Sequence, residues 1–359
     1  MNTAVDPSSS VLIFILAFSV VLIVTPIADS LGRKLGIVAV TGGRRQSEAD
    51  QRGVSKLGSL CLFIAFTISV LVAQILPVPR LDPYEIIRLI GLLAGSAVIF
   101  VVGFLDDIFQ FRAITIFIGQ SAAAAIAIAF QIFIEFFNNP ITGHQTDPWA
   151  HIVTVALSFF WLVGMMNTVN FLDGLDGLAG GVAFIAGVLL FLNSAVRVDP
   201  PQTSISLLML ALLGASFGFL LNNFYPARII MGGGAYYLGY LLGTLSIIGG
   251  AKMATILLVM GLPLMDVIWQ AVNRLRLGRN PFVGDRGHVH YRLLDLGFSQ
   301  RQIVLGYYIF CAFFGILTLI LDSQFYKFVA LSVMLILVII GFGLLARTNI
   351  NHAGSSKSS

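Results

Sequence analysis

The sequence predicts an all-α, polytopic membrane protein with about eleven transmembrane helices, an N-terminus outside the cell and a C-terminus in the cytoplasm. Hydrophobic residues make up 57% of the chain and charged residues only 11%. Apolar runs of about 20 residues are long enough to cross a bilayer, and in lipid only helices and closed barrels satisfy every backbone polar group. The runs that support this prediction are, in order, 10–28, 56–77, 86–105, 113–134, 150–166, 178–196, 204–222, 235–249, 251–270, 304–322 and 326–346.

We expect these runs to form one integral-membrane domain, residues 1–350, followed by a disordered tail over 351–359. No separate globular segment interrupts the runs, and the chain ends in the polar sequence G-S-S-K-S-S. The first run does not resemble a cleavable signal, because its flank M-N-T-A-V-D-P-S-S-S lacks Lys and Arg and the run is long for such a segment. The eighth and ninth runs meet at Gly249-Gly250, so only two glycines separate them.

The distribution of positive charge predicts the orientation. With eleven spans, 16 of the 21 Lys and Arg residues fall in one set of loops and 5 in the other. Cytoplasmic loops carry the excess of Lys and Arg, so the richer set and the C-terminus are expected in the cytoplasm. If 235–270 formed one re-entrant unit, the last loops would change sides and the two counts would be nearly even. The residues of the poorer set are Arg80, Arg88, Arg197, Lys252 and Lys327.

Two adjacent carboxylates, Asp106 and Asp107, end the third apolar run in G-F-L-D-D-I-F. Such a pair suits Mg²⁺, which takes oxygen ligands and keeps substrate phosphates in its coordination shell. One of the two could serve as a general base if like-charge crowding favours its protonated form. The alternative is an ordinary acidic pair at the level of the lipid headgroups.

The polar segment 167–181 reads N-T-V-N-F-L-D-G-L-D-G-L-A-G-G and follows the fifth run directly. A carboxylate near hydrocarbon depth costs roughly 2.5–3.5 kcal/mol on insertion scales, so two of them require a function or a cation. On a helix, residues three apart share a face, and the glycines permit close approach of a ligand or another helix. The alternative is a polar loop with glycine turns. The residues that could form one polar stripe are Asn167, Asn170, Asp173 and Asp176.

A further polar motif, P-F-V-G-D-R-G-H-V-H-Y-R, lies in the last large cytoplasmic loop. His288 and His290, flanked by Arg286 and Arg292, suit an anionic diphosphate better than a metal, because nothing nearby resembles a closed zinc set. The alternative is a basic loop that follows the positive-inside bias. Asp266, in G-L-P-L-M-D, precedes this loop at the cytoplasmic end of its span.

The order of these motifs carries a resemblance to a known family. G-F-L-D-D, the segment 167–181, G-F-L-L-N-N-F-Y-P-A-R-I-I-M-G, P-L-M-D and P-F-V-G-D-R-G-H-V-H-Y-R-L-L-D-L-G resemble the polyprenyl-phosphate N-acetylhexosamine-1-phosphate transferases. That superfamily includes the bacterial phospho-MurNAc-pentapeptide translocase. The eleven spans and the D-R-x-H-x-H pattern are more similar to its undecaprenyl-phosphate GlcNAc-1-phosphate transferase branch. The resemblance runs from about Thr25 to about Gln302.

The resemblance implies that a UDP-linked amino sugar gives its sugar-1-phosphate to a polyprenyl phosphate and that UMP leaves. The reaction would take place at the cytoplasmic face of a bacterial plasma membrane, as the first step of a cell-envelope glycan. Mg²⁺ or Mn²⁺ would bridge the diphosphate; no nucleic acid is implied, and the fold is compatible with a homodimer. By motif, Asp106, Asp107 and Asp173 would be catalytic and metal-binding residues. The substrate-binding residues would be Asn167, Asn170, Asp176, Asn223, Arg286, His288 and His290.

The chain departs from the family pattern in several places. The family has a metal-binding Asp after M-G, whereas here Gly232 to Gly234 follow Met231. The Lys expected shortly after the D-D pair is Ile116, the third His of H-x-H-H is Tyr291, and the early P-R-x-G-G pattern reads S-K-L-G-S. These departures keep open a weakened or inactive relative that binds lipid phosphate or nucleotide sugar. A secondary transporter is a third alternative, but it predicts mid-span charges and an internal repeat, and neither is clear here.

Overall fold

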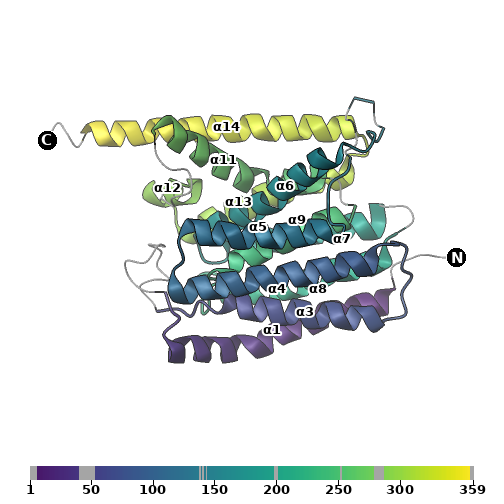
Figure 1. Cartoon of the computed structure of the whole chain (residues 1–359). Helices are drawn as coiled ribbons and strands as arrows, with labels where there is room; N and C mark the ends of the chain where they lie inside the picture. Colours follow the sequence, from purple (N-terminus) through teal and green to yellow (C-terminus); the bar gives the residue numbers. More distant parts are fainter. Residues whose placement is uncertain are drawn as a thin grey trace.

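The computed structural model of the chain describes residues 6–39, 53–136, 139, 141–142, 144–197, 201–250, 253–278 and 287–355 (Figure 1). Within these ranges the regular structure is helical, and the only β-pairings are isolated bridges that join Ser55 to Val38 and to Ile229. The helices are α1 (Pro7–Leu35), α3 (Gly58–Ile75), α4 (Glu85–Phe109), α5 (Ala113–Ala129), α6 (His151–Leu172), α7 (Leu178–Leu192), the π-helical turn η1 (Asn193–Arg197), α8 (Thr203–Asn223), α9 (Gly234–Ile248), α10 (Met253–Val259), α11 (Gly261–Arg276), α12 (Val289–Asp295), α13 (Gln300–Ile320) and α14 (Gln324–Ser355).

The helices confirm an all-α, multi-pass membrane protein. Among the described residues, 8 helices are long and apolar enough to cross a bilayer, and α5 and α9 are shorter apolar helices. The count of eleven spans and the orientation of the termini stay predictions. Figure 1 shows α1 beginning at one end of the helix bundle and α14 ending at the other, with α12 near the end of α14.

The ninth apolar run, expected as one span over 251–270, is divided into α10 and α11. Pro263 lies in the first turn of α11 and has no backbone N–H, so it cannot bond to the carbonyl of Val259 and continue the helix. Gly261, at the break, packs against α14, because a Cβ there would lie 2.0 Å from Cε of Met334. The last helix also differs from expectation: α14 continues to Ser355 and includes 351–355 of the predicted tail.

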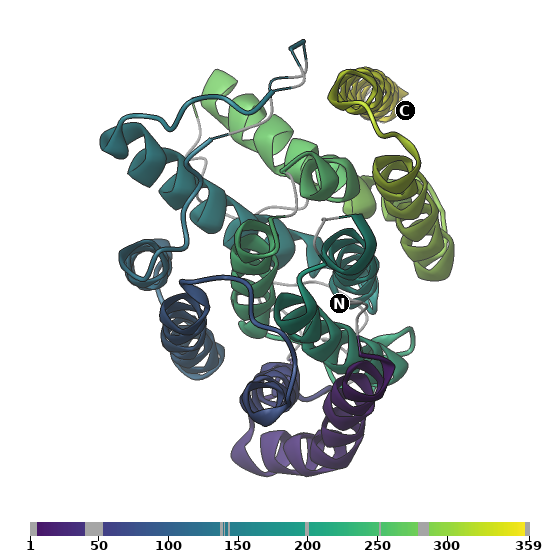
Figure 2. The same cartoon turned by 90° about the vertical axis from the view of Figure 1, so that its right-hand side faces the viewer.

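The core lies around α8 and α9. Of the membrane-span windows, that of α8 is 83% buried, whereas those of α1 and α14 are 28% and 22% buried. Every residue of α9 except Ile247 is also buried. Figure 2, which views the bundle along its helices, shows α1 (purple) and α14 (yellow) at the periphery. Their many exposed Leu, Ile, Val and Phe side chains suit contact with lipid.

Candidate functional site

The end of α4 meets the start of α9 through Asp107. Asp106 and Asp107 are half-buried in the last turns of α4. Oδ2 of Asp107 accepts a hydrogen bond from the backbone N–H of Gly233, at 2.7 Å, and Gly233 is the N-cap of α9. A carboxylate at a helix N-terminus is stabilised by the helix dipole. Gly232 has a φ of 63°, and a Cβ on it would lie 2.3 Å from Oδ2 of Asp107. The three-glycine segment is therefore shaped around this carboxylate.

A tight turn over 173–177 joins α6 to α7. Helix α6 ends at Leu172, with the buried Asp173 as its C-cap. Gly177 has a φ of 82°, a conformation that favours glycine, and it starts α7. The expected helical stripe from Asn167 to Asp176 is therefore wrong in its last step, because the helix has ended before Asp176.

Asp176 and Asn223 fasten this turn to the segment that follows α8. Oδ2 of Asp176 accepts a hydrogen bond from the backbone N–H of Ala227, at 2.9 Å. Oδ1 of Asn223 accepts one from Gly177 N–H at 3.1 Å, and its Nδ2 donates to the carbonyl of Ile229 at 3.0 Å. Both side chains are almost completely buried. Each therefore holds backbone segments together at the site, and a direct role in substrate binding stays a prediction.

The two asparagines of α6 differ in their surroundings. Nδ2 of Asn167 donates to Oε1 of Gln120 at 3.0 Å and to the carbonyl of Val163 at 2.8 Å. Nε2 of Gln120 returns a hydrogen bond to Oδ1 of Asn167 at 3.3 Å. This amide pair joins α6 to α5. Asn170 is half-buried one turn further along α6, closer to Asp173.

The histidine motif packs against the turn at 173–177. The ring of His288 stacks on Phe171, with centroids 5.0 Å apart, and on His290, with centroids 5.8 Å apart. A Cβ on Gly174 would lie 2.2 Å from Nε2 of His290, and the hydroxyl of Tyr291 donates to the carbonyl of Gly174 at 3.5 Å. Only a glycine fits this contact without displacing the histidine.

A continuous set of contacts therefore joins the predicted motifs at one end of the bundle. It runs from Asp107 to the segment 223–233, from there to the turn at 173–177, and from that turn to His290 and His288. Arg286 lies outside the described residues, as does the rest of 279–286. Among the residues that the structure does describe, no group of three or more His, Cys, Asp or Glu side chains could hold a metal ion. A shared ion for Asp106, Asp107 and Asp173 stays a prediction.

The buried polar face of α11 is part of the site, although the motifs alone did not assign it. Oδ2 of Asp266 lies 2.9 Å from Nδ1 of His288, and its Oδ1 accepts a hydrogen bond from Val289 N–H at 3.2 Å. Nε2 of Gln270 donates to the carbonyl of Gly287. Asp266 and Gln270 are four residues apart, and Arg274 is buried at the next such position. This spacing of polar residues on one helical face is the signal that marks the face in the sequence.

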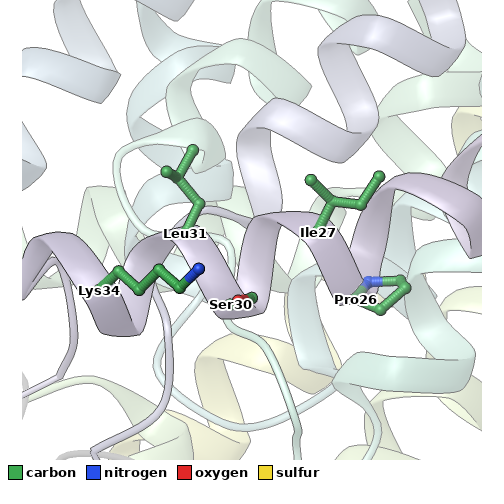
Figure 3. Close-up of a pocket in the computed structure, with 5 residues that line it drawn as sticks. All are labelled: Pro26, Ile27, Ser30, Leu31 and Lys34. Carbon is green, nitrogen blue, oxygen red and sulfur yellow. The ribbon is translucent and has the colours of Figure 1, made fainter.

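A hollow of about 420 Å³ lies on the flank of α1 (Figure 3). None of the predicted site residues lines it, and its only charged group is the amine of Lys34. Because the lining comes from a single helix, this hollow is a surface groove apart from the motifs. The residues that line it are Pro26, Ile27, Ser30, Leu31 and Lys34.

Comparison with known proteins gives consistent matches. The family model described as glycosyl transferase family 4 matches residues 89–250. A protein of Bacillus subtilis (strain 168), named as a probable undecaprenyl-phosphate N-acetylglucosaminyl 1-phosphate transferase, is 30% identical over 92% of this chain and 89% of its own. A decaprenyl-phosphate N-acetylglucosaminephosphotransferase of Mycobacterium tuberculosis (strain ATCC 25618 / H37Rv) is 29% identical over 78% and 74%. A phospho-N-acetylmuramoyl-pentapeptide-transferase of Oceanobacillus iheyensis is 27% identical over 87% and 97%.

Proposed function

This chain belongs to glycosyl transferase family 4, and we propose that it transfers an N-acetylhexosamine-1-phosphate from a UDP-sugar to a polyprenyl phosphate such as undecaprenyl phosphate. An oxygen of the lipid phosphate attacks the phosphorus that carries the sugar. The bond from that phosphorus to the oxygen bridging the two phosphates breaks, and UMP leaves. The observation that carries the proposal is the set of contacts that joins Asp107, the turn at 173–177 and the histidine pair. The named activities of the relatives support it.

The acidic residues fit the divalent ion, Mg²⁺ or Mn²⁺, that this chemistry requires. Mg²⁺ is typically held by one or two carboxylates together with substrate phosphates, and half-buried Asp106 and Asp107 supply such oxygens at the end of α4. Asp173 is the next carboxylate of the proposed set. When bound, the ion neutralises charge on the diphosphate, which is the main requirement of phosphoryl transfer besides positioning. Asp107 also keeps the start of α9 in place through Gly233.

The remaining residues serve substrate binding in this proposal. His288 and His290 bind the donor diphosphate, and Arg286, which lies outside the described residues, is assigned to the same role by its motif alone. The nucleotide side of the site is shaped by Asn167, Asn170, Asp176 and Asn223. The acceptor reaches the site from the bilayer, and the soluble donor reaches it from the cytoplasm. The product would begin a cell-envelope glycan in a bacterial plasma membrane.

The test is UMP release by the purified protein in lipid nanodiscs supplied with undecaprenyl phosphate, UDP-GlcNAc and Mg²⁺. We expect release that requires all three and that stops on addition of EDTA. Asp106→Asn and Asp107→Asn should each lower the rate by about 100-fold or more, since removal of a transition-state charge contact costs about 3–4 kcal/mol. Absence of UMP release with every UDP-amino sugar tried would refute the transferase proposal.

A second candidate, a relative that binds lipid phosphate or nucleotide sugar without transfer, is favoured by the three glycines at 232–234. The family Asp is missing there, and Ile116, at the place of the family Lys, is a buried residue of α5. Insertion of Asp between Gly232 and Gly233 discriminates the two candidates. If the wild-type chain is active and the insertion changes nothing, the second candidate fails. If the wild-type chain binds UDP-GlcNAc but releases UMP only after the insertion, it stands.

A further inference from the structure

We propose that Asp266 is a positioning residue that sets the orientation and tautomer of His288, so that Nε2 of His288 meets a phosphoryl oxygen of the nucleotide-sugar donor. The inference rests on the proposed transferase function for the identity of the ligand. The pairing of the two side chains does not depend on it.

The geometry of the pair is that of a buried carboxylate–imidazole contact. Oδ2 of Asp266 lies 2.9 Å from Nδ1 of His288, and the two residues expose only 4% and 3% of their surface. Oδ1 of the same carboxylate accepts a hydrogen bond from the backbone N–H of Val289. The ring itself lies between Phe171 and His290. Two stacked rings therefore define the plane of the imidazole, and one carboxylate defines its rotation.

The carboxylate of Asp266 also determines which ring nitrogen of His288 is available to a ligand. An ionised carboxylate only accepts hydrogen bonds, so Nδ1 of His288 must carry a proton toward Asp266. Nε2 is the other ring nitrogen, and it is buried without a hydrogen-bond partner among the described residues. A buried polar atom without a hydrogen-bond partner destabilises the protein, and a bound ligand would remove that cost. An oxygen of a diphosphate would accept a hydrogen bond from Nε2 once the ring carries its second proton, balanced by Asp266.

Helix α11 holds the backbone of the histidine segment, residues 287–292, as well as the ring of His288. Gln270, one turn after Asp266, donates to the carbonyl of Gly287, and Nε of Arg292 donates to the same carbonyl at 2.7 Å. Because the break at Met260 and Pro263 separates α11 from α10, α11 takes its own direction beside α6 and α14. The polar face of α11 therefore fixes the histidine segment against Gly174.

Asp266→Asn is the sharpest test, because an asparagine has one acceptor oxygen where the aspartate uses two. If that oxygen keeps the bond to Val289 N–H, its NH₂ group faces Nδ1, and Nδ1 must give up its proton. We expect kcat/KM for UDP-GlcNAc to fall about 10- to 100-fold, by analogy with the carboxylates that orient metal-bound histidines. The KM for undecaprenyl phosphate should not change, whereas a general loss of structure would affect both substrates.

A double-mutant cycle identifies the route of the effect. His288→Gln should itself lower kcat/KM for UDP-GlcNAc, and adding Asp266→Asn to it should cause no further loss if Asp266 acts through His288. Asp29→Asn is the matched control, because Asp29 is a partly exposed carboxylate of α1, paired with Arg33 at 3.0 Å. This control should retain wild-type kinetics. Losses that multiply in the double variant would overturn the inference.

Nitrogen-15 NMR of histidine-labelled protein in nanodiscs provides a readout that needs no activity. The chain has only 5 His residues, and His288→Gln identifies the signal of interest. We expect a proton on Nδ1 of His288 in the wild type, its loss in Asp266→Asn, and protons on both nitrogens after addition of UDP-GlcNAc. A wild-type signal with the proton on Nε2 alone would overturn the inference. If the wild type releases no UMP, the transferase proposal fails, and the substrate-free spectra still decide whether Asp266 positions His288.

Discussion

At the scale of single residues, the site depends on positions where a side chain would not fit. Gly174 carries the contact between the turn at 173–177 and His290, and Gly232 carries the contact with Asp107. The sequence identified Gly174 and the other glycines of 167–181 as places of close approach, but it did not identify Gly232 as one. It could not identify the approaching partner, because the contact from Gly174 to His290 joins residues more than 100 positions apart. The hydrogen bond from the backbone N–H of Ala227 to the side chain of Asp176 was not foreseen either, because its partners lie 51 positions apart.

Gly174→Ala should disturb the donor side of the site. The new Cβ would lie 2.2 Å from Nε2 of His290 and 2.9 Å from the hydroxyl of Tyr291. Overpacking of this kind costs about 1–3 kcal/mol, so we expect a lower unfolding temperature and a higher KM for UDP-GlcNAc. The control is Gly164→Ala in α6, where nothing lies within 4 Å of the new Cβ. It should keep the KM and gain up to about 1 kcal/mol of stability. An unchanged KM in Gly174→Ala would contradict the observed contact.

At the scale of helices, composition predicted where most spans lie but not how they meet or where they break. Burial in lipid requires only a long apolar run, so the ten runs other than 251–270 each correspond to a helix. The break between α10 and α11 depends on Pro263 and on the room that Gly261 leaves for Met334. An apolar run with a proline near its middle can be a kinked helix or two helices, and the packing of α14 decides between them.

The contact between α4 and α9 is a backbone contact, and it sets the position of Asp107. A Cβ on Gly103 would lie 2.4 Å from the carbonyl oxygen of Gly233, and no side-chain rotation relieves that clash. Gly103→Ala should therefore separate the two helices, weaken the bond from Gly233 N–H to Asp107, and lower stability by about 1–3 kcal/mol. Gly341→Ala in α14 adds the same methyl group in open space.

We expect the Gly103 variant to require more Mg²⁺ for half-maximal UMP release, with the Gly341 variant indistinguishable from wild type. Thermal unfolding in detergent and a Mg²⁺ titration in nanodiscs measure the two effects. A destabilised Gly103 variant with an unaltered Mg²⁺ requirement would show that the α4–α9 contact is structural only.

At the scale of the whole molecule, hydropathy alone does not separate the central helices from the peripheral ones, because the windows of α1 and α14 are more apolar than that of α8 and yet far less buried. Helices α8 and α9 are buried on nearly all sides. Asn223 is the last residue of α8 and Gly233 is the N-cap of α9, and a short connection joins the two. The site thus lies where the most buried part of the core reaches one end of the bundle. The distribution of Lys and Arg predicted which set of loops lies in the cytoplasm, but the contacts between the motifs require the packed bundle.

The side of the membrane that this end faces is the last prediction. Helix α13 separates Asp295, at the end of α12, from Ser323, at the start of α14, so the two lie on opposite sides if α13 crosses the bilayer. Both are exposed, and the two native cysteines are buried. In intact spheroplasts, a membrane-impermeant maleimide should label Ser323→Cys and should label Asp295→Cys only after permeabilisation, because the excess of Lys and Arg lies on the side of α12. Labelling of Asp295→Cys in intact spheroplasts would place the His288 segment outside, away from cytoplasmic nucleotide sugars. The orientation and the proposed donor would then fail together.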